Sequence, residues 1–167
     1  MIDCNKIIIR LMMLQDWPFI KAIYQEGILS NNATFQTAVP SYQEWDHNHL
    51  SQLRYVACFN NEVIGFVALS LMSAREVYAG VCEVSIYIKK AFHQQGVGKI
   101  LLSYVIEQAE MKGIWTLYAN IIAENIGSIK LHQACGFRIV GYRDKIARDR
   151  KGQWRNTILL EKRSTFI

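Results

Sequence analysis

One stretch of the sequence, residues 83–112, constrains the fold more than any other. At its start, residues 82–88 alternate between apolar side chains at even positions and polar or amphipathic ones at odd positions. This alternation predicts a β-strand that buries one face and directs Glu83 from the other. Gly96-Val97-Gly98 follows, and then an apolar run at helical spacing that stops at Gly113. The predicted order is strand, glycine loop, helix.

The glycine loop predicts a site for a phosphate group. A helix opened by Gly-x-Gly leaves backbone N–H groups free at the positive end of the helix dipole, and a ligand can approach the main chain closely. A dinucleotide fingerprint, however, needs a third glycine where Leu101 stands, and a P-loop needs Ser or Thr where Ile100 follows Gly98-Lys99. Neither nucleotide motif fits, and an ordinary turn with two glycines stays open at this point.

Composition favours one domain over residues 1–167, since 51% of the residues are apolar and only two are proline. No apolar run approaches a membrane span, and the first residues are unlike a signal peptide. Four widely spaced cysteines predict reduced thiols in a cytoplasmic protein, with no metal site. The net charge of +5 suits an anionic ligand, but only residues 148–151 form a basic cluster, so we expect neither nucleic acid nor a membrane as partner.

Periodicity and turn residues predict the element order β-α-α-β-β-β-α-β-α-β-β. A helix is expected after an Asp16 cap, ending at Gly27, and a second one from a capping box at Ser41 to about Leu53. The remaining predicted helices cover the run after the glycine loop and residues 126–135. The predicted strands are residues 7–12, 55–59, 63–72, 82–88, 116–122, 137–147 and 154–162. This order is typical of an α/β (α+β) fold with a mixed sheet and helices on both faces.

Several motifs, taken in order, resemble the Gcn5-related N-acetyltransferase (GNAT) superfamily. Residues 93–98, His-Gln-Gln-Gly-Val-Gly, are similar to its coenzyme motif, and Asn125 with Leu131-His132 and Gly136-Phe137 is similar to a second signature. Within it, the chain most resembles the phosphinothricin and methionine sulfoximine acetyltransferases, through Thr34-Phe35, Arg75-x-x-Tyr78, Glu83-x-Ser85-x-Tyr87 and Gly152-x-Trp154. The resemblance covers nearly the whole chain. It implies a GNAT-like, mostly antiparallel sheet of about seven strands, splayed centrally and flanked by about four helices.

The resemblance also implies acetyl-CoA as co-substrate and no metal. The pyrophosphate would lie on the glycine loop, and the pantetheine arm would pair with the strand before it, where two parallel strands splay apart. The implied coenzyme-binding residues are Ile86, Tyr87, Ile88, His93, Gln94, Gln95, Gly96, Val97, Gly98, Lys99 and Asn125. An opened strand edge suits this role because it offers unpaired N–H and C=O groups.

Two residues are candidates for proton transfer. Glu83, on the polar face of its strand, could accept the proton of the attacking amine, and an ion pair with Arg75 is the structural alternative. His132 stands where many members of the superfamily carry a tyrosine that protonates the thiolate; a packed helix histidine is its alternative. Backbone N–H groups of the same strand would polarise the thioester carbonyl.

The acceptor site is expected around a loop that carries Arg75, whose guanidinium could grip a carboxylate or phosphinate. Phe35, Tyr78 and Trp154 could wall the pocket. The chain departs from the family pattern at His93 and Gln94, which bears on coenzyme affinity, and at Gln36 and Asn156, which bears on the acceptor.

The predicted function is direct, ternary-complex transfer of an acetyl group to the α-amino group of a small amino-acid-like acceptor, of the phosphinothricin, methionine sulfoximine or methionine sulfone type. A polyamine or a peptide N-terminus is an alternative acceptor. A non-catalytic coenzyme-A-binding regulator is the alternative of another class, and the oligomeric state stays open, a homodimer included.

Overall fold

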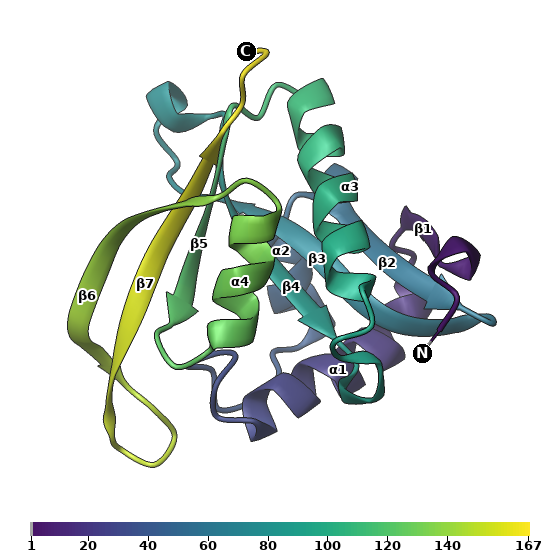
Figure 1. Ribbon diagram of the computed structural model, residues 1–167, viewed down its shortest axis with the longest axis horizontal. Helices are drawn as coiled ribbons and strands as arrows, with labels where there is room; N and C mark the ends of the chain where they lie inside the picture. Colours follow the sequence, from purple (N-terminus) through teal and green to yellow (C-terminus); the bar gives the residue numbers. More distant parts are fainter. Residues whose placement is uncertain (1) are drawn as a thin grey trace.

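The protein is organised around one seven-stranded sheet, described here from a computed structural model over residues 2–167 (Figure 1). The spatial order is β1-β2-β3-β4-β5-β7-β6. Every neighbouring pair is antiparallel except β4 and β5, which are parallel. The strands are β1 (Ile8–Leu11), β2 (Arg54–Phe59), β3 (Glu62–Leu71), β4 (Val81–Ile88), β5 (Thr116–Ile122), β6 (Arg138–Arg148) and β7 (Trp154–Arg163). The predicted mixed, mostly antiparallel sheet is confirmed.

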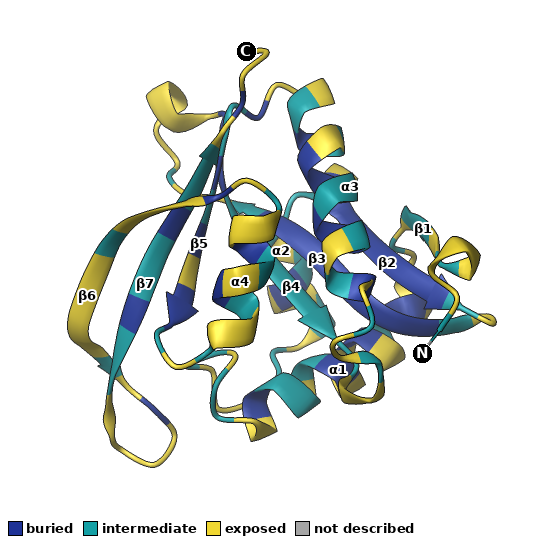
Figure 2. Cartoon of the chain, viewed as in Figure 1, coloured by how far each residue is buried: buried dark blue, intermediate teal, exposed yellow. Residues whose placement is uncertain are grey.

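Four α-helices cover the two faces of this sheet and create two cores. They are α1 (Trp17–Leu29), α2 (Tyr42–Asn48), α3 (Val97–Met111) and α4 (Ile126–Ala134). The larger core joins α3 and α4 to one face, and the smaller core joins α1 and α2 to the other. Figure 2 shows that burial is densest along the central strands β2 and β3. Within residues 2–167, no helix is long and apolar enough to cross a membrane.

Strand β4 separates the two cores in the way that its alternation predicts. Cys82 and Val84 are buried in the larger core, which α3 and α4 cover, whereas Tyr87 packs into the smaller core on the other face. Burial raises the pKa of the Cys82 thiol to about 11, which makes this cysteine a poor nucleophile. Glu83 therefore projects from the face that α1 and α2 cover.

The first helix corrects two expectations. It continues through Gly27 to Leu29, and Gly27 is not its end. A Cβ at Gly27 would lie 2.8 Å from Cε1 of Tyr87, so this position needs glycine for close packing. Asp16 makes no side-chain capping bond to α1. Its carboxylate instead accepts two hydrogen bonds of 2.7 Å from Arg10 and one of 2.8 Å from the Met13 N–H.

The second helix begins at the predicted capping box but ends earlier than expected. The Ser41 hydroxyl accepts a hydrogen bond from the Glu44 N–H, and the Glu44 carboxylate accepts one from the Ser41 N–H. The helix ends at Asn48 because His49 is extended, with φ −125° and ψ 144°. The Arg54 guanidinium donates to the carbonyl oxygens of Asp46 and His49, so it satisfies groups that a longer helix would have used.

Candidate active site

The sheet opens between its two parallel strands. β4 and β5 pair only at Val81–Thr116, Cys82–Leu117 and Glu83–Tyr118. Beyond these rows β4 pairs with β3 alone, and β5 continues against β7 (Figure 1). The edge of β4 from Val84 to Ile88 therefore carries main-chain groups with no partner from β5. Such an edge can accept an extended ligand as if it were another strand.

The glycine loop lies at the end of this open edge, where β4 leads into α3. Gly96 is the N-cap of α3 with φ +86°, a left-handed conformation that favours glycine. No side chain caps this helix, so its first N–H groups are free to bind an anion. Gly98 serves a different need. A Cβ there would lie 3.0 Å from Cδ2 of Leu131, so glycine lets α3 approach α4.

Two polar side chains of the loop are already engaged within the protein. The His93 Nε2–H donates to the carbonyl oxygen of Ile88 at 2.8 Å and fixes the turn after β4. The Gln95 amide donates to the Ala91 carbonyl and accepts from the Ile2 N–H. Gln94, with φ +58°, and Lys99 are exposed. A phosphate at this loop would therefore meet mainly backbone N–H groups.

Glu83 lies at the row where the two parallel strands begin to separate, and its partner comes from β5. The Tyr118 hydroxyl donates a hydrogen bond of 3.0 Å to Oε2 of Glu83. Burial raises the pKa of Glu83, while the Tyr118 hydroxyl and the positive charge of Arg143 act in the opposite direction. Among residues 2–167, none donates to the other carboxylate oxygen. Glu83 is therefore a half-buried carboxylate with one free oxygen and an increased affinity for a proton.

Aromatic side chains lie beside Glu83 on the same face of β4. The rings of Tyr87 and Tyr24 have centroids 4.9 Å apart, and Tyr87 also stacks on Phe66. Burial raises the pKa of Tyr87, and the neighbouring Thr34 side chain lowers it. Tyr87 thus links β4 to α1 and to the loop that carries Thr34 and Phe35.

His132 lies on the opposite side of the sheet, buried in α4 with 2% of its surface exposed. Its Nδ1–H donates to the Ser128 carbonyl oxygen at 2.8 Å, which assigns the lone pair to Nε2. Nε2 is buried and has no hydrogen-bond partner within the described residues. Burial lowers the pKa of His132, so the ring is neutral near pH 7 and a proton placed on Nε2 is easily given up.

Asn125 is the N-cap of α4. Its side-chain oxygen accepts a hydrogen bond of 3.2 Å from the Ser128 N–H. This contact begins the helix that carries His132 and orients its first turn. The side-chain NH₂ of Asn125 has no partner among residues 2–167 and is available to a ligand.

Arg75 lies in the loop between β3 and β4, beside Tyr78. The Arg75 guanidinium lies 5.4 Å from the centroid of the Tyr78 ring, and both residues are exposed. No ion pair joins Arg75 to a carboxylate within residues 2–167, so the structural alternative for Glu83 is not supported. Trp154 is 52% exposed and lies under Arg148, at 4.5 Å, and its predicted role as a pocket wall finds no support.

Sequence reasoning missed Tyr118. The alternation along β5 could have identified it. Leu117 and Ala119 face the larger core, so Tyr118 must point to the other side of the sheet, the side to which Glu83 of β4 also points. The register that places the two opposite each other, however, joins residues 35 positions apart. Local periodicity carries no information about such a register.

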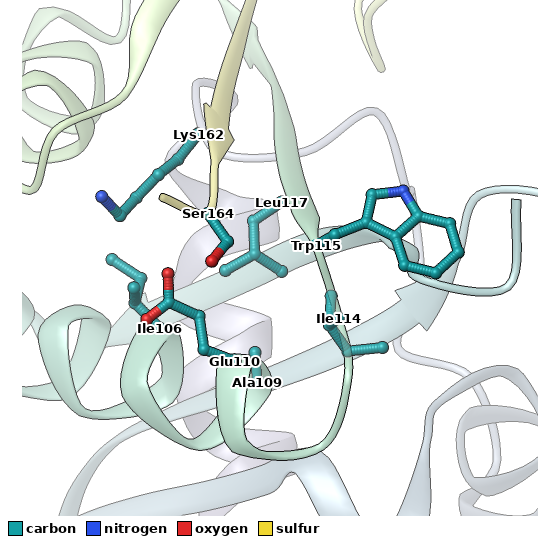
Figure 3. A pocket seen from close by; sticks show the side chains of 8 residues that line it. All are labelled: Ile106, Ala109, Glu110, Ile114, Trp115, Leu117, Lys162 and Ser164. Carbon is teal, nitrogen blue, oxygen red and sulfur yellow. The ribbon is translucent and has the colours of Figure 1, made fainter. Parts of the chain in front are cut away.

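A small pocket lies elsewhere, beside the C-terminal end of α3 (Figure 3). It is lined by Ile106, Ala109, Glu110, Ile114, Trp115, Leu117, Lys162 and Ser164. None of the predicted site residues lines it, and we assign it no role. No group of three His, Cys, Asp or Glu side chains that could hold a metal ion occurs in residues 2–167.

Glu83 lies where β4 and β5 separate, and the open edge of β4 leads from it to the glycine loop and the free N–H groups of α3. The Acetyltransferase (GNAT) family matches residues 17–137, and the chain belongs to this family. It is an N-acetyltransferase that uses acetyl-CoA.

Several relatives within this family are acetyltransferases named for phosphinothricin or for methionine sulfoximine and sulfone. A phosphinothricin N-acetyltransferase of Alcaligenes faecalis is 29% identical over 92% of this chain and 81% of its own length. An L-methionine sulfoximine/L-methionine sulfone acetyltransferase of Pseudomonas aeruginosa is 27% identical over 83% of this chain and 84% of its own. The solved structure of a phosphinothricin acetyltransferase from Sinorhizobium meliloti, in complex with acetyl-CoA, is similar with a TM-score of 0.86 and 27% identity, over 95% of this chain and 88% of that one.

Proposed function

We propose that this enzyme transfers the acetyl group of acetyl-CoA to the α-amino group of a small amino-acid-like acceptor, of the phosphinothricin or methionine sulfoximine and sulfone type. The observation that carries the proposal is Glu83, a half-buried carboxylate with a raised pKa at the start of the open edge of β4. The activities of the relatives described above support this acceptor class.

The coenzyme would bind along the open edge and the glycine loop. The pantetheine arm pairs along the edge of β4 at Ile86, Tyr87 and Ile88, where β5 no longer pairs with this strand. The Ile88 carbonyl oxygen already accepts the His93 Nε2–H and is not among the free groups. The pyrophosphate lies on the N–H groups at the start of α3, with the charge of Lys99 nearby. Asn125 contributes its free NH₂ from the turn before α4. The thioester then lies toward Glu83.

Glu83 acts as the general base in this proposal. The acceptor's ammonium group must lose a proton before its nitrogen can attack the thioester carbon. The free carboxylate oxygen takes that proton directly or through one water, while Tyr118 holds the other oxygen. Attack forms the amide bond and breaks the carbon–sulfur bond, and no covalent enzyme intermediate is needed.

His132 would handle the proton of the leaving group. Its Nδ1–H is fixed on the Ser128 carbonyl, so only Nε2 can exchange a proton. Nε2 carries the lone pair of the neutral ring, so it would take up the proton that the attacking nitrogen releases as the amide forms and pass it to the leaving thiolate. Because the ring is buried, that proton is held only weakly. The acceptor side would be formed by Phe35, Arg75 and Tyr78, with the guanidinium gripping the acidic group of the acceptor.

Initial rates on a matched acceptor panel test the proposal. The panel holds L-methionine sulfone, phosphinothricin, the amine that lacks the carboxylate of methionine sulfone, spermidine and a short peptide with a free N-terminus. The proposal expects turnover of the first two and a large loss for the amine without a carboxylate. Faster turnover of spermidine or the peptide would reject the acceptor class. Acetyl-CoA binding without turnover of any acceptor would favour the regulatory alternative.

A further inference from the structure

A buried carboxylate lies in the turn between β6 and β7, far from Glu83 in the sequence. The tip of this hairpin is otherwise exposed (Figure 2), but the side chain of Asp149 is only 2% exposed. It accepts hydrogen bonds from the N–H groups of Lys151 and Gln153, at 2.9 and 3.0 Å, which fold the turn. It also accepts one of 2.9 Å from the Asn31 side chain, in the loop after α1.

Arg155 extends this contact to a third segment. One nitrogen of its guanidinium donates to Asp149 at 3.1 Å and to the Asn31 carbonyl oxygen at 3.0 Å. The other donates to the Asn32 side-chain oxygen at 3.1 Å and to the Glu124 carboxylate at 3.2 Å. One arginine, 13% exposed, therefore joins the hairpin tip, the loop after α1 and the turn before α4 (Figure 1).

The three segments differ in how much they depend on this network. The turn before α4 has main-chain bonds of its own, from Ala123 N–H to Asn156 O at 3.0 Å and from Asn125 N–H to Ile122 O at 2.8 Å. The main chain of residues 31–36, by contrast, makes only local hydrogen bonds in the described structure, apart from the one that Arg155 donates. Apart from the Asn32 NH₂, which donates to the Glu124 carbonyl oxygen at 3.4 Å, and Thr34, which contacts Tyr24 and Tyr87, the loop after α1 is held in place by this network.

This loop carries Phe35 and Thr34, and the Thr34 side chain contacts Tyr87 on the Glu83 face of β4. We propose that Arg155 and Asp149 are positioning residues that hold the loop of residues 31–36 against the acceptor side of the active site. The inference rests on the proposed function. Neither side chain touches a reactant. Loss of either one frees the loop, weakens acceptor binding and leaves the coenzyme side, with its own main-chain bonds, intact.

Three variants separate this role from general stability. Arg155→Met removes the guanidinium. Asn31→Gly removes the side-chain bond from Asn31 to Asp149 and leaves the contacts of Asn32 in place. The φ of +54° at Asn31 suits glycine, so the fold is retained. Arg138→Met is the matched control, because it breaks the exposed Arg138–Glu161 ion pair on the same hairpin.

Hydrogen exchange of residues 30–37 and steady-state kinetics are measured for each variant. Loss of a charge-assisted hydrogen bond predicts that Arg155→Met raises the loop's exchange rate and the acceptor KM roughly tenfold or more. Asn31→Gly does so to a smaller extent, the acetyl-CoA KM stays within about twofold for both, and Arg138→Met changes neither quantity.

Unchanged loop exchange in Arg155→Met and Asn31→Gly would overturn the inference, whatever the activity. An equal rise in the acetyl-CoA KM would also overturn it, because the effect would then not be confined to the acceptor. If the wild-type protein acetylates no amino acid, the proposed function fails. The exchange data still decide in that case whether Arg155 and Asp149 hold the loop.

Discussion

Replacing Glu83 by glutamine removes the proposed base and keeps its shape. The glutamine amide oxygen can still accept the 3.0 Å hydrogen bond from Tyr118, so the neighbouring strand is not disturbed. What is lost is the proton affinity of a carboxylate whose pKa is raised by burial. A positioned general base contributes about 10²–10⁴-fold, so kcat/KM for the acceptor should fall by that factor near pH 7. This corresponds to about 2.7–5.4 kcal/mol of barrier.

The pH dependence identifies the cause of this loss. Solvent deprotonates the acceptor's amine as the pH passes its pKa, about 8 for an α-amino group, and the deficit of Glu83→Gln should narrow there. The assay is the pH profile of kcat/KM for both proteins at saturating acetyl-CoA. Glu107→Gln, on the exposed side of α3, is the matched control and should behave as wild type.

Stability distinguishes the base from a structural carboxylate. A carboxyl group whose folded pKa lies above its unfolded value costs stability as the pH rises from its ordinary pKa through the raised one. The neutral Glu83→Gln protein should therefore melt at pH 7 no lower than wild type. A variant with wild-type kcat/KM at pH 7 would refute Glu83 as the base. A strongly lowered melting temperature would instead indicate a structural role.

Three further changes test other parts of the site. Arg75→Ala should cost roughly 1.5–3 kcal/mol in acceptor kcat/KM and leave the acetyl-CoA KM unchanged, and an equal loss on acceptors without an acidic group would show another role. Tyr118→Phe removes a hydrogen bond that favours the Glu83 carboxylate, so the acidic limb of the pH profile should move to higher pH; no movement contradicts the coupling. Gly98→Ala places a Cβ 3.0 Å from Leu131 and should raise the acetyl-CoA KM and lower the melting temperature, and adding Leu131→Ala should recover both; no recovery would show that this contact is not the cause.

Local patterns were sufficient for the order of elements and for the faces of β4. The alternation of residues 82–88 places Cys82 in one core and Glu83 on the other face, because a strand's side chains alternate strictly. The glycine loop was likewise readable, since Gly96 needs its left-handed conformation locally.

Contacts between distant segments could not be predicted in this way. Gly27 reads as a helix end, but the Tyr87 ring that requires it comes from a strand 60 residues later. The Glu83–Tyr118 contact depends on the register of two parallel strands, and Arg155 depends on how a hairpin tip meets the loop after α1. Each is fixed by packing of the whole sheet, and local sequence preferences do not encode it.

Hydrogen exchange along β4, with and without acetyl-CoA, tests most directly that the open edge of this strand is the coenzyme site. Saturation is checked by thermal unfolding, since a ligand at a hundredfold its dissociation constant adds about 2.7 kcal/mol of stability. Exchange should slow in residues 84–88 and 94–99 and should not change around the pocket of Figure 3. Full thermal stabilisation with unchanged exchange in residues 84–88 would contradict the account, because the coenzyme would then bind elsewhere.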